Sequence, residues 1–254
     1  MILAIDIGNS SINLGIFTSS ALFVRKFDTF PLLPPAEYTA LVNQFIAEKH
    51  VEKKAEGIII SSVVPGHTKV FMRVFAGISS RKPLTVSHAL KTGLAFRIPN
   101  PGELGADRIA NAAAAYEFSR DAVAVVDCGT ATTISIVDRD GNYTGGAIMP
   151  GIRLMNESLA RGASQLFEVP VRPPVSALGT STAECIQAGL IFGTAGAVER
   201  ILKETEKEAG CRLKTVVTGG YGEMMSGFLT RTHVLLPFLT LEGLHIIYRK
   251  NTDA

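Results

Sequence analysis

The sequence lacks several features that would mark a specialised class of protein. It contains no Trp, only three Cys in 254 residues, and 25 Lys and Arg against 23 Asp and Glu, with no block of like charges. This near balance gives no support to nucleic-acid binding. Cys128, Cys185 and Cys211 are too few and too widely spaced for a disulfide framework or a CxxC zinc site, and they fit a reducing, cytoplasmic compartment.

Long apolar runs are missing as well. None approaches the roughly 18 residues that a membrane-spanning helix needs, and the longest candidate, residues 188–198, is flanked by charge. The apolar N-terminus has no basic residues before it and meets Asp6 too early for a signal peptide. We therefore expect no membrane segment. With 46% hydrophobic and 19% charged residues, the composition is typical of an ordinary globular protein.

The chain repeats one order of elements. Alternating or continuous β-type runs predict strands, and apolar residues at a helical period predict helices. In the first half the expected strands are 2–5, 12–16, 21–27, 57–64 and 84–87, and the expected helices are 38–49, 68–75 and 108–118. The order restarts with strands at 123–127 and 133–137, a third strand after the turn at 141–143, helices at 152–160 and 181–208, a strand at 215–220 and a helix at 239–249.

This repetition predicts an α/β fold of two duplicated domains, 1–118 and 119–254, with a cleft between them. One continuous doubly wound sheet is the alternative. Neither of the common glycine-rich nucleotide motifs, GxGxxG and GxxxxGK followed by Ser or Thr, occurs in the chain, so any phosphate must be held in another way.

The first turn with chemical potential is DIGNS, residues 6–10. It lies between two strands, and its backbone N–H groups and hydroxyls can face an anion such as phosphate. Asp6 would repel phosphate unless a cation stands between them, which indicates Mg²⁺ held through water. A plain tight hairpin is the alternative reading of this turn.

The second turn, DCGTATT, repeats the pattern at the end of another buried strand. Asp127 is followed by a glycine and by the hydroxyls of Thr130, Thr132 and Thr133. Two such turns would hold a triphosphate from both sides. A third corner, TGGYG at 218–222, offers backbone against which a nucleoside could lie; an ordinary strand-to-helix turn is the alternative.

Together with GADR (105–108) and GGAIMPG (145–151), these ordered motifs resemble those of the type III pantothenate kinases. That family belongs to the superfamily of actin, sugar kinases and heat-shock chaperones. The resemblance implies two duplicated actin-like (ribonuclease H-like) α/β domains with a nucleotide cleft between them. The activity that it implies is ATP-dependent phosphorylation of pantothenate to 4′-phosphopantothenate, the first step of coenzyme A biosynthesis. It also implies Mg²⁺, a monovalent cation (K⁺ or NH₄⁺), and a homodimer with the pantothenate pocket against the partner subunit.

The resemblance also assigns roles to single residues. Asp107, at a predicted helix start where the macrodipole favours an ionised carboxylate, is expected to accept the alcohol proton; a helix N-cap without chemistry is the alternative. Asp127 is expected to hold the monovalent cation. ATP and its phosphates are expected to contact Asp6, Gly8, Asn9, Ser10, Ser11, Asn13, Thr130 and Gly219. Pantothenate is expected to contact Gly105, Ala106, Asp107, Arg108, Thr182 and the position of Ile98.

The sequence departs from the family pattern at two of these positions. Ser10 replaces the usual Thr and keeps its hydroxyl, whereas Ile98 replaces a Tyr that often contacts pantothenate. The second departure leaves open a kinase of another small alcohol. A non-catalytic, nucleotide-binding transcriptional accessory factor is the other alternative, and the presence of Asp107 argues against it. His67 and His88 have no partner that the sequence identifies, and no role is assigned to them.

Overall fold

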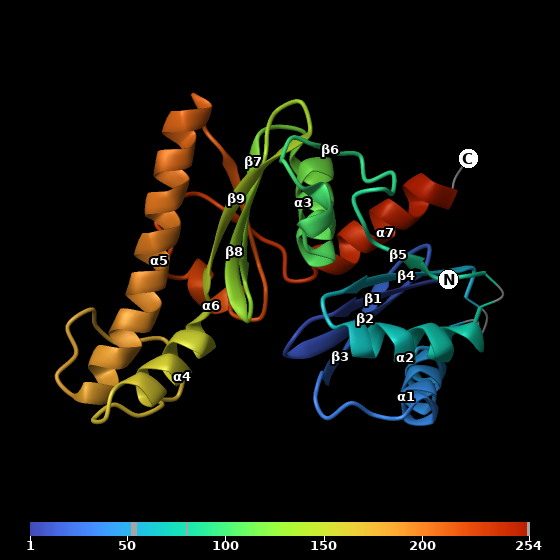
Figure 1. The fold of residues 1–254 in the computed structure, drawn as a ribbon, viewed down its shortest axis with the longest axis horizontal. Helices are drawn as coiled ribbons and strands as arrows, with labels where there is room; N and C mark the ends of the chain where they lie inside the picture. The colour runs from blue at the N-terminus through green and yellow to red at the C-terminus, as the bar shows by residue number, and fades with distance from the viewer. Residues whose placement is uncertain (52–54, 80, 253–254) are drawn as a thin grey trace. The chain divides into compact units, whose positions relative to one another are not determined.

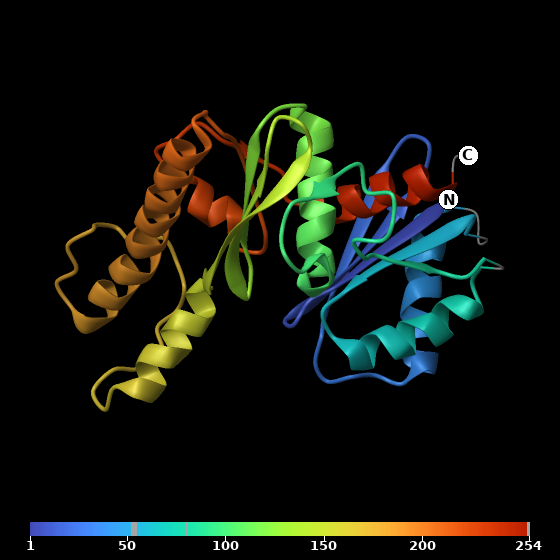
Figure 2. The same cartoon turned by 45° about the horizontal axis from the view of Figure 1, so that its top comes forward.

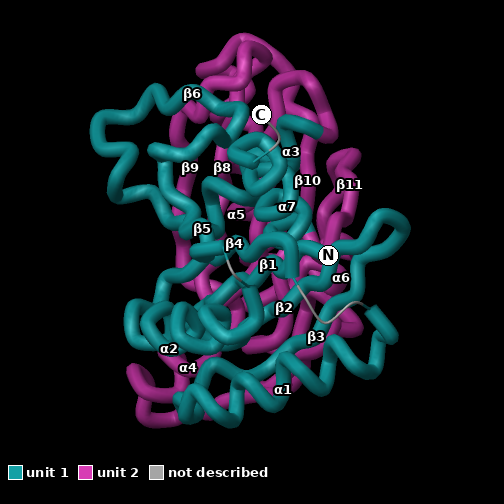
Figure 3. The backbone as a smooth tube through the Cα atoms, turned by 90° about the vertical axis from the view of Figure 1, so that its right-hand side faces the viewer, with its two compact units in different colours: residues 1–117, 239–254 teal, residues 118–238 magenta. Residues whose placement is uncertain are grey.

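The computed structural model describes residues 1–51, 55–79 and 81–252, which form a mixed α/β protein with two sheets (Figure 1). Contacts within the chain divide it into two compact units. The first unit is Met1–Glu117 with Leu239–Ala254, and the second is Phe118–Phe238 (Figure 3). The first unit therefore includes the end of the chain, whereas the sequence analysis assigns residues 239–254 to the second domain.

The sheet of the first unit has the strand order β3-β2-β1-β4-β5. Strand β1 runs antiparallel to β2 and parallel to β4. The strands are β1 (Ile2–Ile7), β2 (Ser11–Phe17), β3 (Leu22–Asp28), β4 (Gly57–Ser62) and β5 (Leu84–Thr85). The other elements of this unit are α1 (Pro35–Glu48), α2 (Pro65–Ala76), β6 (Ala95–Phe96), the 3-10 helix η1 (Pro101–Glu103), α3 (Ala106–Ser119) and α7 (Leu239–Thr252).

Helices cover both faces of this sheet. Leu3, Ile5 and Ile7 of β1 pack with α1 and α2 on one face, and Ala4 packs with α3 and α7 on the other. Because side chains alternate along a strand, Asp6 lies on the face of Ala4, which is the face that α3 covers.

The apolar side of α7 explains why the last helix joins the first unit. Leu244, Ile247 and Tyr248 belong to one buried cluster with Ala4 of β1 and Ala110 of α3. This contact is long-range, so the helical period of the segment predicts the helix without predicting its partner.

The second unit repeats the topology of the first. Its strands lie in the order β11-β10-β7-β8-β9; β7 runs antiparallel to β8 and parallel to β10. The strands are β7 (Val123–Cys128), β8 (Ala131–Val137), β9 (Asn142–Pro150), β10 (Lys214–Thr218) and β11 (Val234–Leu235). The helices are α4 (Ile152–Gly162), α5 (Thr182–Ala209) and α6 (Gly222–Ser226), and α4 and α5 lie on the same side of the sheet (Figure 2).

Helix α5 is long and apolar enough, by length and composition, to cross a membrane. Half of its most apolar stretch is buried inside the structure, and the core helix of a globular protein passes the same test. This helix is therefore weak evidence for a span. The sequence analysis, which counts uninterrupted apolar residues, names residues 188–198 of this helix as its longest candidate and finds them too short for a span. The averaged window reaches further because it tolerates the occasional charge.

Candidate active site

Asp6 lies in a row of polar side chains across three strands of the first sheet. It pairs in register with Asn13 of β2 and with Ser61 of β4. The Ser61 hydroxyl, which is fully buried, donates a hydrogen bond to Asp6 Oδ1 at 2.9 Å. Ser61 therefore orients the Asp6 carboxylate. Sequence reasoning missed this residue because the pairing of β1 with β4 depends on the fold.

The loop that follows Asp6 is held from two sides. Within the loop, Gly8 N donates to Ser11 O at 3.0 Å. From outside it, the buried Thr29 donates from its hydroxyl to Gly8 O at 2.7 Å and from its backbone N to Ser10 O at 3.3 Å. Asn9, at the tip, is exposed. The loop is thus a tight hairpin held by hydrogen bonds, as the small turn-forming residues of DIGNS predict.

Asp107 lies at the same end of the first sheet as this loop. Val63 follows β4 and donates from its backbone N to Ile7 O, at the end of β1, at 3.1 Å. A Cβ built on Gly105 would lie 3.9 Å from Val63 Cγ1 and 2.5 Å from Asp107 Oδ1. The structure therefore brings the GADR segment to the carboxyl ends of β1 and β4, where Asp6 also lies.

The first turn of α3 holds the remaining residues of GADR. Ala106 begins the helix, and Asp107 and Arg108 are half-buried. Arg108 N donates to Asp107 Oδ1 at 2.8 Å. A carboxylate in the first helical turn accepts such bonds readily, since the N–H groups there have no partner within the helix.

The second unit repeats the polar row of the first. Asp127 pairs in register with Thr133 of β8 and Thr218 of β10, in the positions that Asn13 and Ser61 occupy around Asp6. This correspondence supports the duplication more strongly than the motifs do, because register relates residues far apart in sequence.

Gly219 packs directly on Asp127. Its backbone has a φ of +91°, and an added Cβ would lie 2.3 Å from Asp127 Oδ1. The neighbouring Cys128 is buried, and burial together with the charge of Asp127 raises the pKa of its thiol to about 12. The thiol is therefore inert at neutral pH.

Thr130 and Thr132 have different environments. Gly151 N, which follows β9, donates to Thr130 O at 3.1 Å, and Thr130 is half-buried. Thr132 is 1% exposed, and its hydroxyl has no hydrogen-bond partner among the described residues. The suggestion that the Thr132 hydroxyl faces phosphate is therefore wrong, because alternation along β8 turns it into the core.

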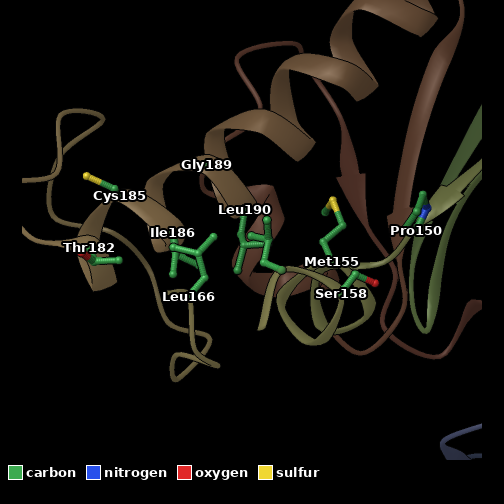
Figure 4. Close-up of a pocket in the computed structure, with 10 residues that line it drawn as sticks. Pro150, Met155, Ser158, Leu166, Thr182, Cys185, Ile186, Gly189 and Leu190 are labelled. Atoms are coloured by element: carbon green, nitrogen blue, oxygen red, sulfur yellow. The ribbon is translucent and has the colours of Figure 1, made fainter. Parts of the chain in front are cut away.

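An apolar pocket of about 600 Å³ lies in the second unit (Figure 4). Thr182, the first residue of α5, lies at one end of it, and Pro150 lies at the other (Figure 4). Thr182 is exposed, so its hydroxyl is accessible to a ligand. Between them the pocket is lined by Met155, Ser158, Leu159, Leu166, Cys185, Ile186, Gly189 and Leu190.

The structure thus places the predicted residues in groups within the separate units. Asp6, the loop 8–11 and the segment 105–108 share one end of the first sheet. Ile98 is half-buried in the segment between β6 and η1. Asp127, Thr130 and Gly219 share one end of the second sheet, and Thr182 lies in the pocket of that unit.

Comparisons with known proteins identify what this arrangement is similar to. The family model described as type III pantothenate kinase matches residues 2–204. A type III pantothenate kinase of Anaeromyxobacter sp. (strain K) is 38% identical over 253 residues, which is 99% of this chain and all of that protein.

Solved structures share the fold over the whole chain. A Campylobacter jejuni protein, described as a conserved candidate Baf family transcriptional activator, has a TM-score of 0.62 at 21% identity, covering 99% of this chain and all of that one. A candidate 2-dehydro-3-deoxygalactonokinase of Sinorhizobium meliloti has a TM-score of 0.55 at 15% identity, covering 100% of this chain and 98% of that one. These likenesses confirm the expected two-domain, actin-like α/β fold.

Proposed function

The chain belongs to the type III pantothenate kinase family, and we propose that it phosphorylates pantothenate with Asp107 as the acceptor of the alcohol proton. Family membership makes it an ATP-dependent kinase that converts pantothenate to 4′-phosphopantothenate in coenzyme A biosynthesis. The single observation that carries the role of Asp107 is its position at the end of the first sheet that also holds Asp6 and the loop 8–11.

The demands of phosphoryl transfer suit a carboxylate in this position. The transition state is loose, so positioning and charge neutralisation contribute more than a strong base does. Asp107 Oδ1 accepts a hydrogen bond from the backbone N–H of Arg108, which fixes it. Gly105 has no Cβ, and a Cβ there would lie only 2.5 Å from Asp107 Oδ1. A weakly basic, fixed carboxylate accepts the proton late in the transfer.

Phosphate binding is assigned to the two turns that begin with an aspartate, DIGNS and DCGTATT. Gly8, Asn9, Ser10, Ser11 and Asn13 would contact phosphates from the first unit, and Thr130 and Gly219 would contact ATP from the second. Asp6 would hold Mg²⁺ through water, since Mg²⁺ in kinases binds one or two carboxylates together with phosphates and waters. When bound, the cation supplies positive charge to the phosphates.

The monovalent cation is assigned to Asp127. No group of three or more His, Cys, Asp or Glu side chains that could hold a metal ion occurs within residues 1–51, 55–79 and 81–252. Asp127 would therefore act with water, backbone carbonyls or phosphate oxygens, which are the hard ligands that K⁺ accepts.

Pantothenate is assigned to the segment 105–108 and to Thr182. The planar fork of Arg108 suits the pantothenate carboxylate. The pocket beside Thr182 is mainly apolar, which suits the methyl-bearing carbon chain of the substrate. Ile98 offers an apolar contact where a Tyr often stands in the family.

The proposed compartment is the cytoplasm. Three cysteines that form no disulfide, Cys128, Cys185 and Cys211, suit its reducing conditions.

A coupled kinase assay tests the reaction and its cation. With ATP, Mg²⁺ and pantothenate, the protein is expected to turn over in K⁺ and to lose most of its activity in Na⁺, because Na⁺ is smaller and more strongly hydrated. Equal activity in Na⁺ and K⁺ would contradict the proposed role of the monovalent cation but not the kinase activity. Turnover of another primary alcohol, but not of pantothenate, would show that the substrate is that other alcohol.

One face of α5 supports a homodimer. A Cβ added at Gly189, Gly193 or Gly196 would meet nothing within 4 Å, and Phe192 is 40% exposed. An apolar helix surface with small residues suits close packing against a second copy. Sedimentation equilibrium is expected to give the mass of two 27.1-kDa chains, and Gly193→Glu is expected to shift it toward one. A single-chain mass for the unmodified protein would contradict the dimer.

A further inference from the structure

His67, to which the sequence assigns no role, is a buried polar residue in the first turn of α2. It is 1% exposed, and its Nε2 lies 2.6 Å from the carbonyl oxygen of Thr29. A carbonyl oxygen only accepts hydrogen bonds, so Nε2 carries the proton in this contact. The ring packs edge-on against Phe30, with centroids 5.4 Å apart, and against Tyr38.

Thr29 continues the contact to the phosphate loop. It is fully buried, its hydroxyl donates to Gly8 O at 2.7 Å, and its backbone N donates to Ser10 O at 3.3 Å. The carbonyls on both sides of Asn9 are therefore bound to one residue, whose own carbonyl is bound by His67. Every link in this chain of hydrogen bonds is buried or half-buried, where such bonds are strongest.

We propose that His67 is a positioning residue for the loop 8–11. It fixes Thr29, and Thr29 fixes the Gly8 and Ser10 carbonyls, so that the loop is ordered before ATP binds. The inference rests on the proposed function, in which this loop contacts the phosphates. The hydrogen bond of His67 goes to Thr29 and not to the loop itself. Its effect is therefore on ATP affinity, since a loop that must be ordered on binding lowers affinity.

Two substitutions at His67 test the proposal. His67→Leu keeps an apolar body and removes the donor, and it is expected to raise the KM for ATP about fivefold, as for one lost hydrogen bond. The KM for pantothenate and kcat are expected to change little. His67→Gln, whose amide N–H can reach the Thr29 carbonyl, is expected to restore most of the ATP affinity.

Thr29→Val provides a second variant that keeps the shape of the side chain. It removes only the hydroxyl bond to Gly8 O, and it is expected to raise the KM for ATP in the same way. Its matched control is Thr39→Val, which removes a hydroxyl bond of 2.8 Å to Pro35 O within α1 and no hydrogen bond to the loop.

A control for stability is Phe71→Leu in the same helix as His67. Phe71 is fully buried, so this change lowers the free energy of unfolding without removing any loop hydrogen bond. A rise in the KM for ATP as large in Phe71→Leu as in His67→Leu would overturn the proposal. So would an unchanged KM in folded His67→Leu and Thr29→Val.

Calorimetric titration with MgATP separates this inference from the proposed function. The wild type and His67→Gln are expected to have smaller ATP dissociation constants than His67→Leu. This order is expected whether or not pantothenate is the acceptor. Failure of the wild type to phosphorylate pantothenate contradicts the function, whereas equal ATP dissociation constants in all variants contradict the role of His67.

Discussion

Replacing Asp107 with Asn is expected to lower kcat by about a hundredfold or more, the usual contribution of a positioned general base. The amide is nearly the same size as the carboxylate, and its oxygen can still accept the hydrogen bond from Arg108 N. The start of α3 and the thermal stability should therefore be preserved. Steady-state kinetics are expected to show the loss in kcat, with the KM for ATP nearly unchanged because Asp107 is not one of the proposed ATP contacts.

Glu103→Gln is the matched control for the loss of charge. Glu103 lies in η1, a few residues before Asp107, is exposed, and accepts a hydrogen bond from Asn100 Nδ2 at 3.2 Å. Neutralising it removes the same charge from the same segment without touching the proposed base. If Asp107→Asn were as active as Glu103→Gln, Asp107 would have to be reassigned as a helix-capping residue.

The Asp107 carboxylate can also be displaced without being removed. A Cβ at Gly105 would lie 2.5 Å from Asp107 Oδ1, which is too close and would push the carboxylate aside, whereas a Cβ at Gly102 would lie 3.6 Å from His88 Cε1, an ordinary contact. Gly105→Ala should therefore lower kcat with little change in stability, and Gly102→Ala should change neither. This pair distinguishes the position of the carboxylate from its presence.

Most elements of the fold could be predicted because the sequence is locally consistent. The helical period predicts a helix over 181–208, and the structure has one at Thr182–Ala209. Its start is fixed by a cap that the structure adds, with Ser181 Oγ accepting a hydrogen bond from Glu184 N. The buried run predicted as a strand over 57–64 ends at Ser62, because Pro65 starts α2. The short α6 and β11 were not predicted, since five- and two-residue elements carry no period.

The candidate site could be predicted only where the chemistry is local. DIGNS, GADR and DCGTATT each contain their turn formers and polar groups within a few residues. Ser61, Thr29 and His67 could not be found, because each acts through a hydrogen bond to a residue distant in sequence. Thr132 illustrates the same limit: only the register of β8 against β7 shows that Thr133, and not Thr132, shares the face of Asp127.

Gly219→Ala is expected to have the largest effect on the second unit. Alanine is strained at a φ of +91°, and its Cβ would lie 2.3 Å from Asp127 Oδ1 and 2.7 Å from the backbone N and C of Cys128. The backbone has little room to shift, since Tyr221 N donates to Cys128 O and Gly222 N donates to Gly219 O, both at 2.9 Å. Strain and overpacking together should lower the free energy of unfolding by about 2–5 kcal/mol.

Gly220→Ala is the matched control, because the adjacent glycine has no positive φ and an added Cβ meets nothing within 4 Å. Chemical denaturation should therefore show a large loss of stability for Gly219→Ala and almost none for Gly220→Ala. In the fraction of Gly219→Ala that remains folded, activation by K⁺ should also weaken, because the carboxylate proposed to hold the cation has been pushed aside. Equal stability and equal K⁺ activation in the two variants would mean that Gly219 does not hold Asp127 in place.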